Sequence, residues 1–262
     1  MLYYSAVNLI DYDTLHAVST EDTLYVKENL YNLRPSLPFY FTAKTNQYIT
    51  VNLLAPKRVQ FCGIFNHNFI SPTLNLHIPD PDAHPVNSVT GPWLHTIPLT
   101  YRANDLYGQF DHTHQWWNLN LDDNSNPNFP RIGELWLGSL SHFTQAYLQP
   151  GREDGAEFFA SEQQTPYGQD WDVYLSESKR LKISFVNLNN PDNVDEIEAF
   201  LSLIRGPEGR FVLIPDHRRP HIYLVKVIGS PTARRDLYSS GNIELRSWSL
   251  DLKVLSRGIT LL

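Results

Sequence analysis

Cysteine, methionine and positive charge are scarce in this chain of 262 residues. It has one cysteine, Cys62, and one methionine, and its formal net charge at pH 7 is −7. A single cysteine excludes an intrachain disulfide and a metal site built from several thiolates of one chain. The negative charge disfavours a protein whose main task is to hold nucleic-acid phosphates, because that task needs a dense cationic surface. We therefore expect no nucleic-acid partner.

Long apolar segments are also absent. No window approaches the ~20 apolar residues of a membrane span. The first residues, MLYYSAVNLIDYD, contain neither a basic region nor a sustained apolar one. We expect no membrane span and no signal peptide, which predicts folding in a cytoplasm. Cys62 lies in the apolar run 61–65, where a buried, inert thiol is expected rather than a nucleophile.

The motifs of common catalytic families are missing too. The chain contains no G-x-S-x-G, no H-E-x-x-H and no glycine-rich phosphate loop. His112 and His114 alternate, so a strand would place both on one face, and this makes a metal site conceivable. No third ligand stands at a diagnostic spacing, so exposed strand or loop histidines are the favoured interpretation. We predict no catalysis, no cofactor and no metal.

The residues that are present favour strands. Aromatic residues make up 13% of the chain, and 18 prolines suggest many short strands with rigid connections. Residues 48–53 alternate between polar and apolar, as in a strand with one buried face. Residues 59–65 are apolar on both faces, which is typical of a central strand. A Pro- and Asp-rich loop is expected from Pro79 to Pro98.

A second pair of strands is expected further along the chain. Residues 115–121 alternate, a turn-forming cluster covers 122–130, and residues 132–137 are mainly apolar. The simplest interpretation is a β-hairpin. Trp116 and Trp117 are adjacent on the first of these strands, so they must point to opposite faces.

The C-terminal part contains one convincing helix, predicted over 191–205. Asn190 is suited to cap it, and Pro191 suits its first position. Its apolar positions recur every three or four residues and form one stripe: Val194, Ile197, Leu201 and Ile204. Strands are expected before and after it, over 181–185, 211–214, 222–228 and 243–255.

These patterns predict a mainly β protein. We expect an N-terminal jelly-roll β-sandwich, followed by an α+β domain with one helix on an antiparallel sheet. The expected divisions are an irregular arm over 1–30, the sandwich over 31–160, and the second domain over 161–262. Three aromatic residues of the sandwich are candidates for a protein interface or a glycan contact: Trp93, Trp116 and Trp136.

The order of these segments resembles that of a known family. The segments I-x-V-N-L, R-V-Q-F-C-G-I-F-N-H-N-F, W-W-N-L-N-L and R-I-G-E-L-W-L-G resemble the galactose-binding-like (discoidin-like) domain found in tail proteins of long-tailed bacteriophages. The later segments R-L-K-I-S-F, L-S-L-I-R-G and R-F-V-L-I-P-D resemble the β-rich second domain of such proteins. The resemblance covers roughly residues 35–260.

The resemblance implies a structural protein of the virion, at the tail tip or baseplate. Such a protein assembles as a homo-oligomeric ring, a trimer or a hexamer, contacts other phage tail proteins, and is folded and assembled in the cytoplasm of the bacterial host. The alternative is a carbohydrate-binding module that recognises host surface glycans. A glycan-active enzyme is a third, weaker hypothesis.

Overall fold

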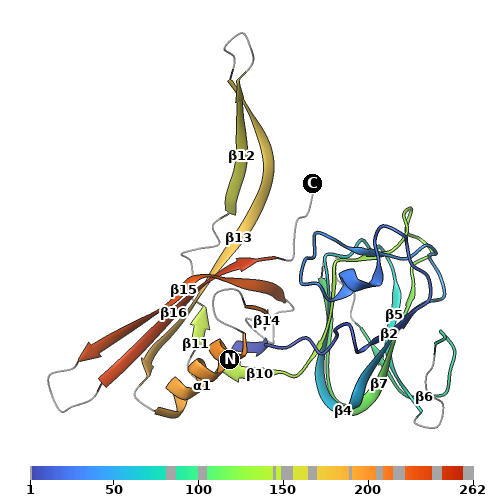
Figure 1. Ribbon diagram of the computed structural model, residues 1–262, viewed down its shortest axis with the longest axis horizontal. Coiled ribbons are helices and arrows are strands. Elements are labelled where there is room, and N and C mark those ends of the chain that lie inside the picture. Colours follow the sequence, from blue (N-terminus) through green and yellow to red (C-terminus); the bar gives the residue numbers. More distant parts are fainter. Residues whose placement is uncertain are drawn as a thin grey trace.

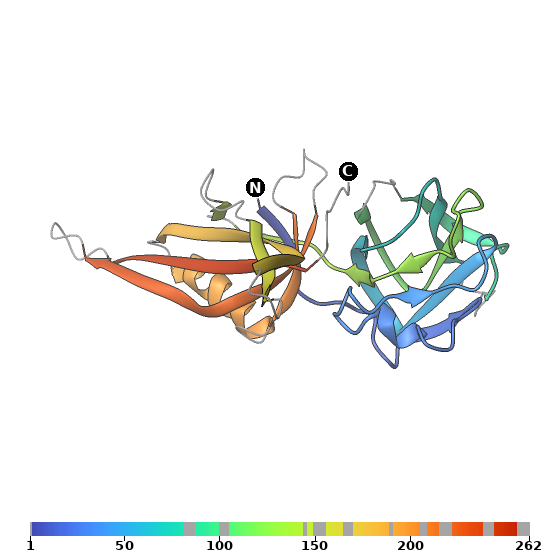
Figure 2. The ribbon, with the colours of Figure 1, turned by 90° about the horizontal axis from the view of Figure 1, so that it is seen from above.

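The computed structural model describes residues 2–80, 87–99, 105–143, 146–148, 156–164, 170–188, 191–204, 209–214, 222–237 and 244–255. Strands dominate, and α1 (Pro191–Leu203) is the one α-helix among these residues. Two bodies of strands lie side by side and give the molecule an elongated shape (Figures 1 and 2). The predicted class, mainly β with one helix and antiparallel sheets, is confirmed.

The first body is the sandwich. Its antiparallel sheet has the order β2-β4-β7-β5-β6, with β9 added beside β4. The strands are β2 (Leu15–Val18), β4 (Gln47–Phe65), β5 (Thr73–Pro79), β6 (Trp93–Pro98), β7 (Asp105–Asp122) and β9 (Glu134–Gly138). A 3-10 helix, η1 (Lys27–Leu30), and a small sheet of β3 (Phe39–Tyr40) with β8 (Arg131–Ile132) complete it.

Strand β4 is bent in its middle. Its register with β7 breaks between Asn52 and Lys57, and Leu54 has a φ of 64°. Residues other than glycine seldom adopt this left-handed conformation, so Leu54 marks a sharp local change of direction. The first half of β4 pairs with β2 and the second half with β9, while β7 follows both halves. The bend thus divides one long strand pair into two parts with different neighbours.

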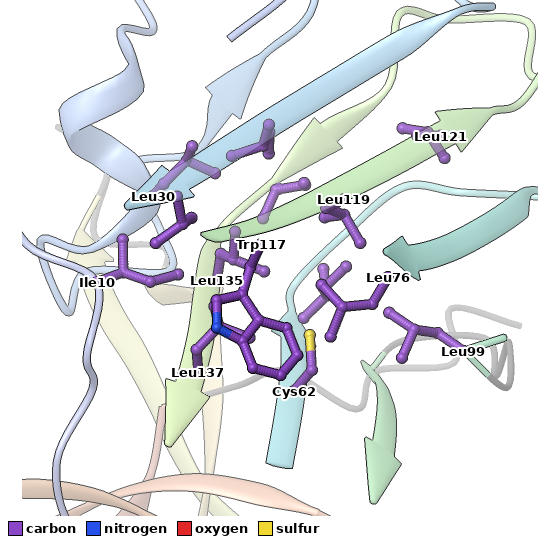
Figure 3. Close-up of a cluster of buried hydrophobic side chains, with 14 of the residues drawn as sticks. Ile10, Leu30, Cys62, Leu76, Leu99, Trp117, Leu119, Leu121, Leu135 and Leu137 are labelled. Atoms are coloured by element: carbon purple, nitrogen blue, oxygen red, sulfur yellow. The ribbon is translucent and has the colours of Figure 1, made fainter. Parts of the chain in front are cut away.

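The inner face of the sandwich is an apolar core (Figure 3). Trp117 of β7 is fully buried in it, close to Cys62 of β4 and Leu137 of β9. Burial raises the pKa of the Cys62 thiol, which therefore stays protonated and inert, as the sequence predicts. At roughly 25 cal/mol per Å² of apolar surface, the burial of such large side chains is the main source of stability.

The hairpin predicted between residues 115–121 and 132–137 is wrong. The first segment belongs to β7, which pairs with β4 and β5, whereas β9 pairs with β4. Adjacent alternating segments favour a hairpin only when their turn brings them together. Here residues 122–130 instead lead the chain to β8, which pairs with β3.

The second body is the eight-stranded sheet. Its order is β10-β1-β14-β15-β16-β13-β11, and β12 pairs with β13 off this path. The strands are β1 (Leu2–Ser5), β10 (Ser141–Phe143), β11 (Ala146–Leu148), β12 (Ala156–Gln164), β13 (Asp170–Leu188), β14 (Arg210–Ile214), β15 (Tyr223–Leu237) and β16 (Glu244–Val254).

Helix α1 lies on this sheet, as predicted, and ends two residues before the predicted boundary of 205. Ile197 and Ile204 are buried against strand residues of the sheet, and Leu201 is partly buried there. Phe200, which the predicted stripe did not include, is the largest buried residue of the helix. The side chain of Val194, the remaining member of the stripe, and the cap residue Asn190 lie outside the described residues.

The arm expected over residues 1–30 is not irregular throughout. Residues Leu2–Ser5 form β1, an internal strand of the eight-stranded sheet between β10 and β14. Leu2 and Tyr4 are buried in the core of that sheet. The sequence does not show the partner of this strand, because β14 lies about 200 residues away in the chain.

The boundary predicted at residue 160 also differs from the observed division between the two sheets. It would cut through strand β12, which pairs with β13 on both sides of that residue. The change of sheet instead falls between β9, which ends at Gly138, and β10, which begins at Ser141. The sandwich is thus inserted between the first and second strands of the eight-stranded sheet.

A third apolar cluster joins the two bodies. Phe61, Phe65 and Trp136 of the sandwich pack against Val212 of β14 and Leu224 of β15. All five side chains are at most 1% exposed. The second half of β4 is therefore covered on both faces, by the sandwich core on one side and by the eight-stranded sheet on the other.

Strands β12 and β13 project from the eight-stranded sheet as a two-stranded ribbon (Figure 1). Nine residues of β12 pair with the first part of β13, which corresponds to a ribbon about 30 Å long. Among the described strands, β12 pairs with β13 alone. In the described part of the chain, no helix has the length and apolar character needed to cross a membrane.

Candidate functional site

The outer face of the sandwich sheet, opposite its core, carries a row of polar residues. Thr50 of β4, Asn118 of β7, His77 of β5 and Thr96 of β6 are successive cross-strand neighbours. Asn118 donates a hydrogen bond from Nδ2 to Oγ1 of Thr50 at 3.0 Å. Nδ1 of His77 lies 2.9 Å from Oγ1 of Thr96. Three members of this row, Thr50, Asn118 and His77, are buried, and Thr96 is exposed.

Trp93 lies at the β6 end of this row. Its ring is stacked on that of His77, with centroids 4.4 Å apart and planes 15° apart, and the side chain remains partly exposed. Desolvation lowers the pKa of His77 to about 4, so the imidazole is neutral near pH 7. A neutral, hydrogen-bonded ring thus supports one face of the indole.

Trp116 lies on the same outer face, on β7. It is partly exposed, and its ring meets that of His16 edge to face at 5.1 Å. Asn52 is its cross-strand neighbour, and Gln115 donates a hydrogen bond to Asn52 at 2.9 Å. Only β5 separates β7 from β6, so Trp116 and Trp93 belong to strands about 10 Å apart. Trp116 and Trp117 point to opposite faces, as predicted.

Trp136, the third aromatic candidate, lies elsewhere. It is 1% exposed in the cluster between the two bodies, and its Nε1 donates a hydrogen bond to Oγ of Ser5 at 3.0 Å. Gly138 permits this approach, because a Cβ there would lie 2.3 Å from Oγ of Ser5. Burial excludes Trp136 from contact with a glycan. It belongs to an interface within the chain, between its two bodies.

Three histidines meet at the edge of the sandwich. His112 and His114 of β7 share one face, as the alternation predicts, and His95 of β6 joins them. His95 was not predicted as a member of this cluster, because residues 79–98 were expected to form a loop, whereas 93–98 form β6. The His-x-His pattern was the only available signal, since the third histidine comes from a different strand.

Another buried ionisable group lies between the two bodies. Glu134 is fully buried, and Asn8 donates a hydrogen bond to its Oε1 at 3.5 Å. Burial raises the pKa of this carboxyl well above its usual value, while the charge of Arg210 on β14 opposes the shift. Its Oε2 has no hydrogen-bond partner among the described residues. Glu134 faces the interface between the two bodies, so we assign it a structural role.

Comparison with known proteins identifies no family for this chain. No family model matches it, and no curated protein matches it by sequence. Among solved structures, chitosan-binding module 1 of a chitosanase/glucanase from Paenibacillus sp. IK-5 is 13% identical, with a TM-score of 0.41, over 51% of this chain and 99% of that one. A fucose-binding module of Streptococcus pneumoniae is 10% identical, with a TM-score of 0.40, over 51% and 98% of the two chains.

The structural neighbours are thus carbohydrate-binding modules. The family 32 module of AlyQ, in complex with 4,5-unsaturated mannuronic acid, is 21% identical, with a TM-score of 0.36, and covers 47% of this chain and 94% of its own. All of these scores lie below 0.5, so the likenesses establish neither the fold nor the function of this chain.

Proposed function

We propose that the protein binds a glycan, without catalysis, through the outer face of its sandwich. The observation that carries this proposal is the pair of partly exposed tryptophans, Trp93 and Trp116, on one sheet face. The weak structural likenesses do not carry it. Sugar rings present C–H faces that pack on aromatic rings, and rigid aromatic side chains supply such contact at low conformational cost.

Polar groups beside the two rings are available to bind hydroxyl groups. Asn52 and Gln115 lie next to Trp116, and all three are partly exposed, while Thr96 next to Trp93 is exposed. A spacing of about 10 Å between the strands that carry the tryptophans suits an oligosaccharide that spans both rings. A ligand of this length would be held by two aromatic contacts and oriented by the polar groups beside each ring.

The test is binding of the purified protein to an array of bacterial surface saccharides and chitosan oligomers. Calorimetry with the strongest ligand then compares Trp93→Ala and Trp116→Ala with the wild type. Each substitution should weaken binding by about fivefold or more, because aromatic anchors that a ligand buries contribute more than ~1 kcal/mol. Phe129→Ala, at a 50% exposed aromatic residue outside this face, is the matched control.

The absence of any array ligand would contradict the proposal. Retention of full affinity in both tryptophan variants would contradict the assignment of the face, even if a ligand is found. Far-UV and near-UV circular dichroism of each variant must match the wild type, so that lost binding is not confused with lost folding.

A second function, assembly into a larger structure, is favoured by the β12–β13 ribbon. An isolated two-stranded hairpin is marginally stable in water, and its unpaired edges are sites for pairing with another chain. We propose that the ribbon contacts a neighbouring subunit or another protein. The resemblance to phage tail proteins would make this assembly a homo-oligomeric ring of a virion tail, formed in the cytoplasm of the bacterial host.

Light scattering over a concentration series tests assembly independently of glycan binding. A discrete oligomer that becomes monomeric when residues 157–178 are replaced by a short turn would support the ribbon's role. A strict monomer at every concentration would contradict self-assembly by this chain alone. Glycan binding by that monomer would support the first proposal and restrict the ribbon to contact with a different protein.

A further inference from the structure

The rings of His95, His112 and His114 lie close together. When one ring nitrogen is taken from each residue, the three nitrogens lie within 4.8 Å of one another. Ring centroids are 4.6 Å apart for His95 and His112, and 6.1 Å apart for both pairs that include His114. None of the three rings has a hydrogen-bond partner among the residues that the structure describes. Three imidazoles thus face one another with nitrogens available.

This arrangement is close to what a tetrahedral metal requires. With metal–nitrogen distances of 2.0–2.1 Å, two imidazole nitrogens bound to one tetrahedral zinc ion lie about 3.3 Å apart. The three nitrogens need to approach by roughly 1.5 Å at most to reach this spacing. His95 is exposed on the edge strand β6, so rotation of its side chain can supply most of that movement.

The surroundings hold the two β7 histidines in place. Phe110 packs behind His112 with centroids 6.3 Å apart, and Trp117 packs behind His114 at 6.4 Å. Nε1 of Trp117 also donates a hydrogen bond to the backbone carbonyl of His114 at 3.3 Å. The site is therefore partly preorganised.

We propose that His95, His112 and His114 bind one divalent cation of the late first-row metals, with zinc as the ion that we would use as probe. Three imidazole nitrogens suit zinc, copper and nickel better than calcium or magnesium, which prefer oxygen ligands. Three protein ligands leave a fourth position for water or for a donor atom of a bound molecule. His95 is exposed, so that position opens to solvent.

The metal would connect two strands that are not hydrogen-bonded to each other. Among the strands that the structure describes, β6 pairs with β5 alone, and β5 separates it from β7. Ligation of His95 to two histidines of β7 would tie this edge strand to the centre of the sheet. Metal binding should therefore raise the melting temperature of the protein, because the metal binds the folded state.

Calorimetric titration of the tag-free, chelator-treated full chain with ZnCl₂ tests the proposal. We expect saturable binding of one ion per chain, at least ~10-fold weaker in His95→Ala and lost in the His112→Ala/His114→Ala double variant. His142→Ala is the matched control, because His142 is an exposed strand histidine of the other body. This control should bind zinc as the wild type does.

Cobalt(II) provides a second readout that does not depend on affinity. Binding at three imidazoles and one water should give the intense visible absorption of four-coordinate cobalt, and zinc should displace it. No saturable zinc binding, or equal binding by wild type and His95→Ala, would overturn the proposal. If the double variant misfolds by circular dichroism, the exposed His95→Ala variant alone decides the outcome.

Discussion

The sandwich closes around its core, whereas the eight-stranded sheet leaves strands that extend beyond its body. In the sandwich, the inner face of the long strands β4 and β7 packs on the apolar core. Their outer face carries polar and aromatic residues along one part and contacts the neighbouring body along the other. In the eight-stranded sheet, α1 packs on the core, while the β12–β13 ribbon continues past it. The first arrangement suits recognition of a ligand, and the second suits contact with another chain.

The two bodies also differ in how far apart their strands lie along the chain. The strands of the sandwich all lie between residues 15 and 138, whereas the eight-stranded sheet needs β1 from the N-terminus and strands that follow residue 140. Its folding thus requires contacts between distant segments, and such contacts form slowly. We expect the sandwich to be the more autonomous of the two.

Removal of residues 1–5 should have the largest effect on the stability of the eight-stranded sheet relative to that of the sandwich. The deletion removes an internal strand, with the buried Leu2 and Tyr4, from the eight-stranded sheet. The eight-stranded sheet should then fail to fold, so the single thermal transition of the full-length protein should be replaced by a smaller transition of the sandwich alone. Calorimetry with circular dichroism measures both. Tyr12→Ala, at a 79% exposed residue, is the control. An unchanged melting profile of the truncated protein would show that β1 is dispensable.

Core truncations test whether the two bodies unfold together. Trp117→Ala in the sandwich and Phe200→Ala on α1 should each lower the free energy of unfolding by about 3–5 kcal/mol. Because the cluster between the bodies couples them, we expect each substitution to shift a single transition of the full-length protein. Chemical denaturation followed by tryptophan fluorescence and circular dichroism measures this. Two separate transitions, each sensitive to one substitution, would mean that the bodies are independent.

The hydrogen bond between Trp136 and Ser5 should contribute less. Trp136→Phe keeps most of the apolar contact and removes the donor, so we expect a loss of about 1 kcal/mol. A double-mutant cycle with Ser5→Ala isolates the interaction between the two side chains. Additive effects of the two substitutions would indicate that this hydrogen bond does not link the bodies.

Glu134→Gln should give the smallest effect, with a defined dependence on pH. The pKa of Glu134 is raised by burial, so the folded state binds its proton more tightly than the unfolded state does. Stability contributed by this group is present below the ordinary glutamate pKa, about 4.3, and is lost as pH rises toward the raised value. The glutamine variant should be the more stable protein at pH 7 and lose this advantage near pH 4, as measured by urea denaturation.

Several local features of the fold were predictable from the sequence. Residues 59–65 are apolar on both faces because Cys62 and Ile64 face the sandwich core, while Phe61 and Phe65 face the other body. The helix was recognisable from its stripe, and Ile197 and Ile204 are buried as that stripe requires. Trp116 and Trp117 separate to the two faces of β7 because side chains alternate along a strand.

The sites were less predictable. Of the three aromatic candidates, Trp93 and Trp116 are partly exposed on one sheet face, but Trp136 is buried against Ser5 from the other end of the sandwich insertion. Only two of the three histidines of the cluster were indicated by the sequence, since the position of His95 depends on β6. Both results follow from strand pairings that no local pattern encodes.

Periodicity along the chain was therefore sufficient for the longer strands of the sandwich, the helix and the face on which a given side chain lies, but not for the short strands β1 and β6. These properties depend on neighbouring residues and on the repeat of two or about 3.6 residues. The partners of β1, the route from β7 to β8 and the meeting of three histidines were decided by the tertiary structure. An alternating pattern predicts which face of a strand is buried but not which strand lies beside it. Packing over the whole molecule determines the neighbouring strand.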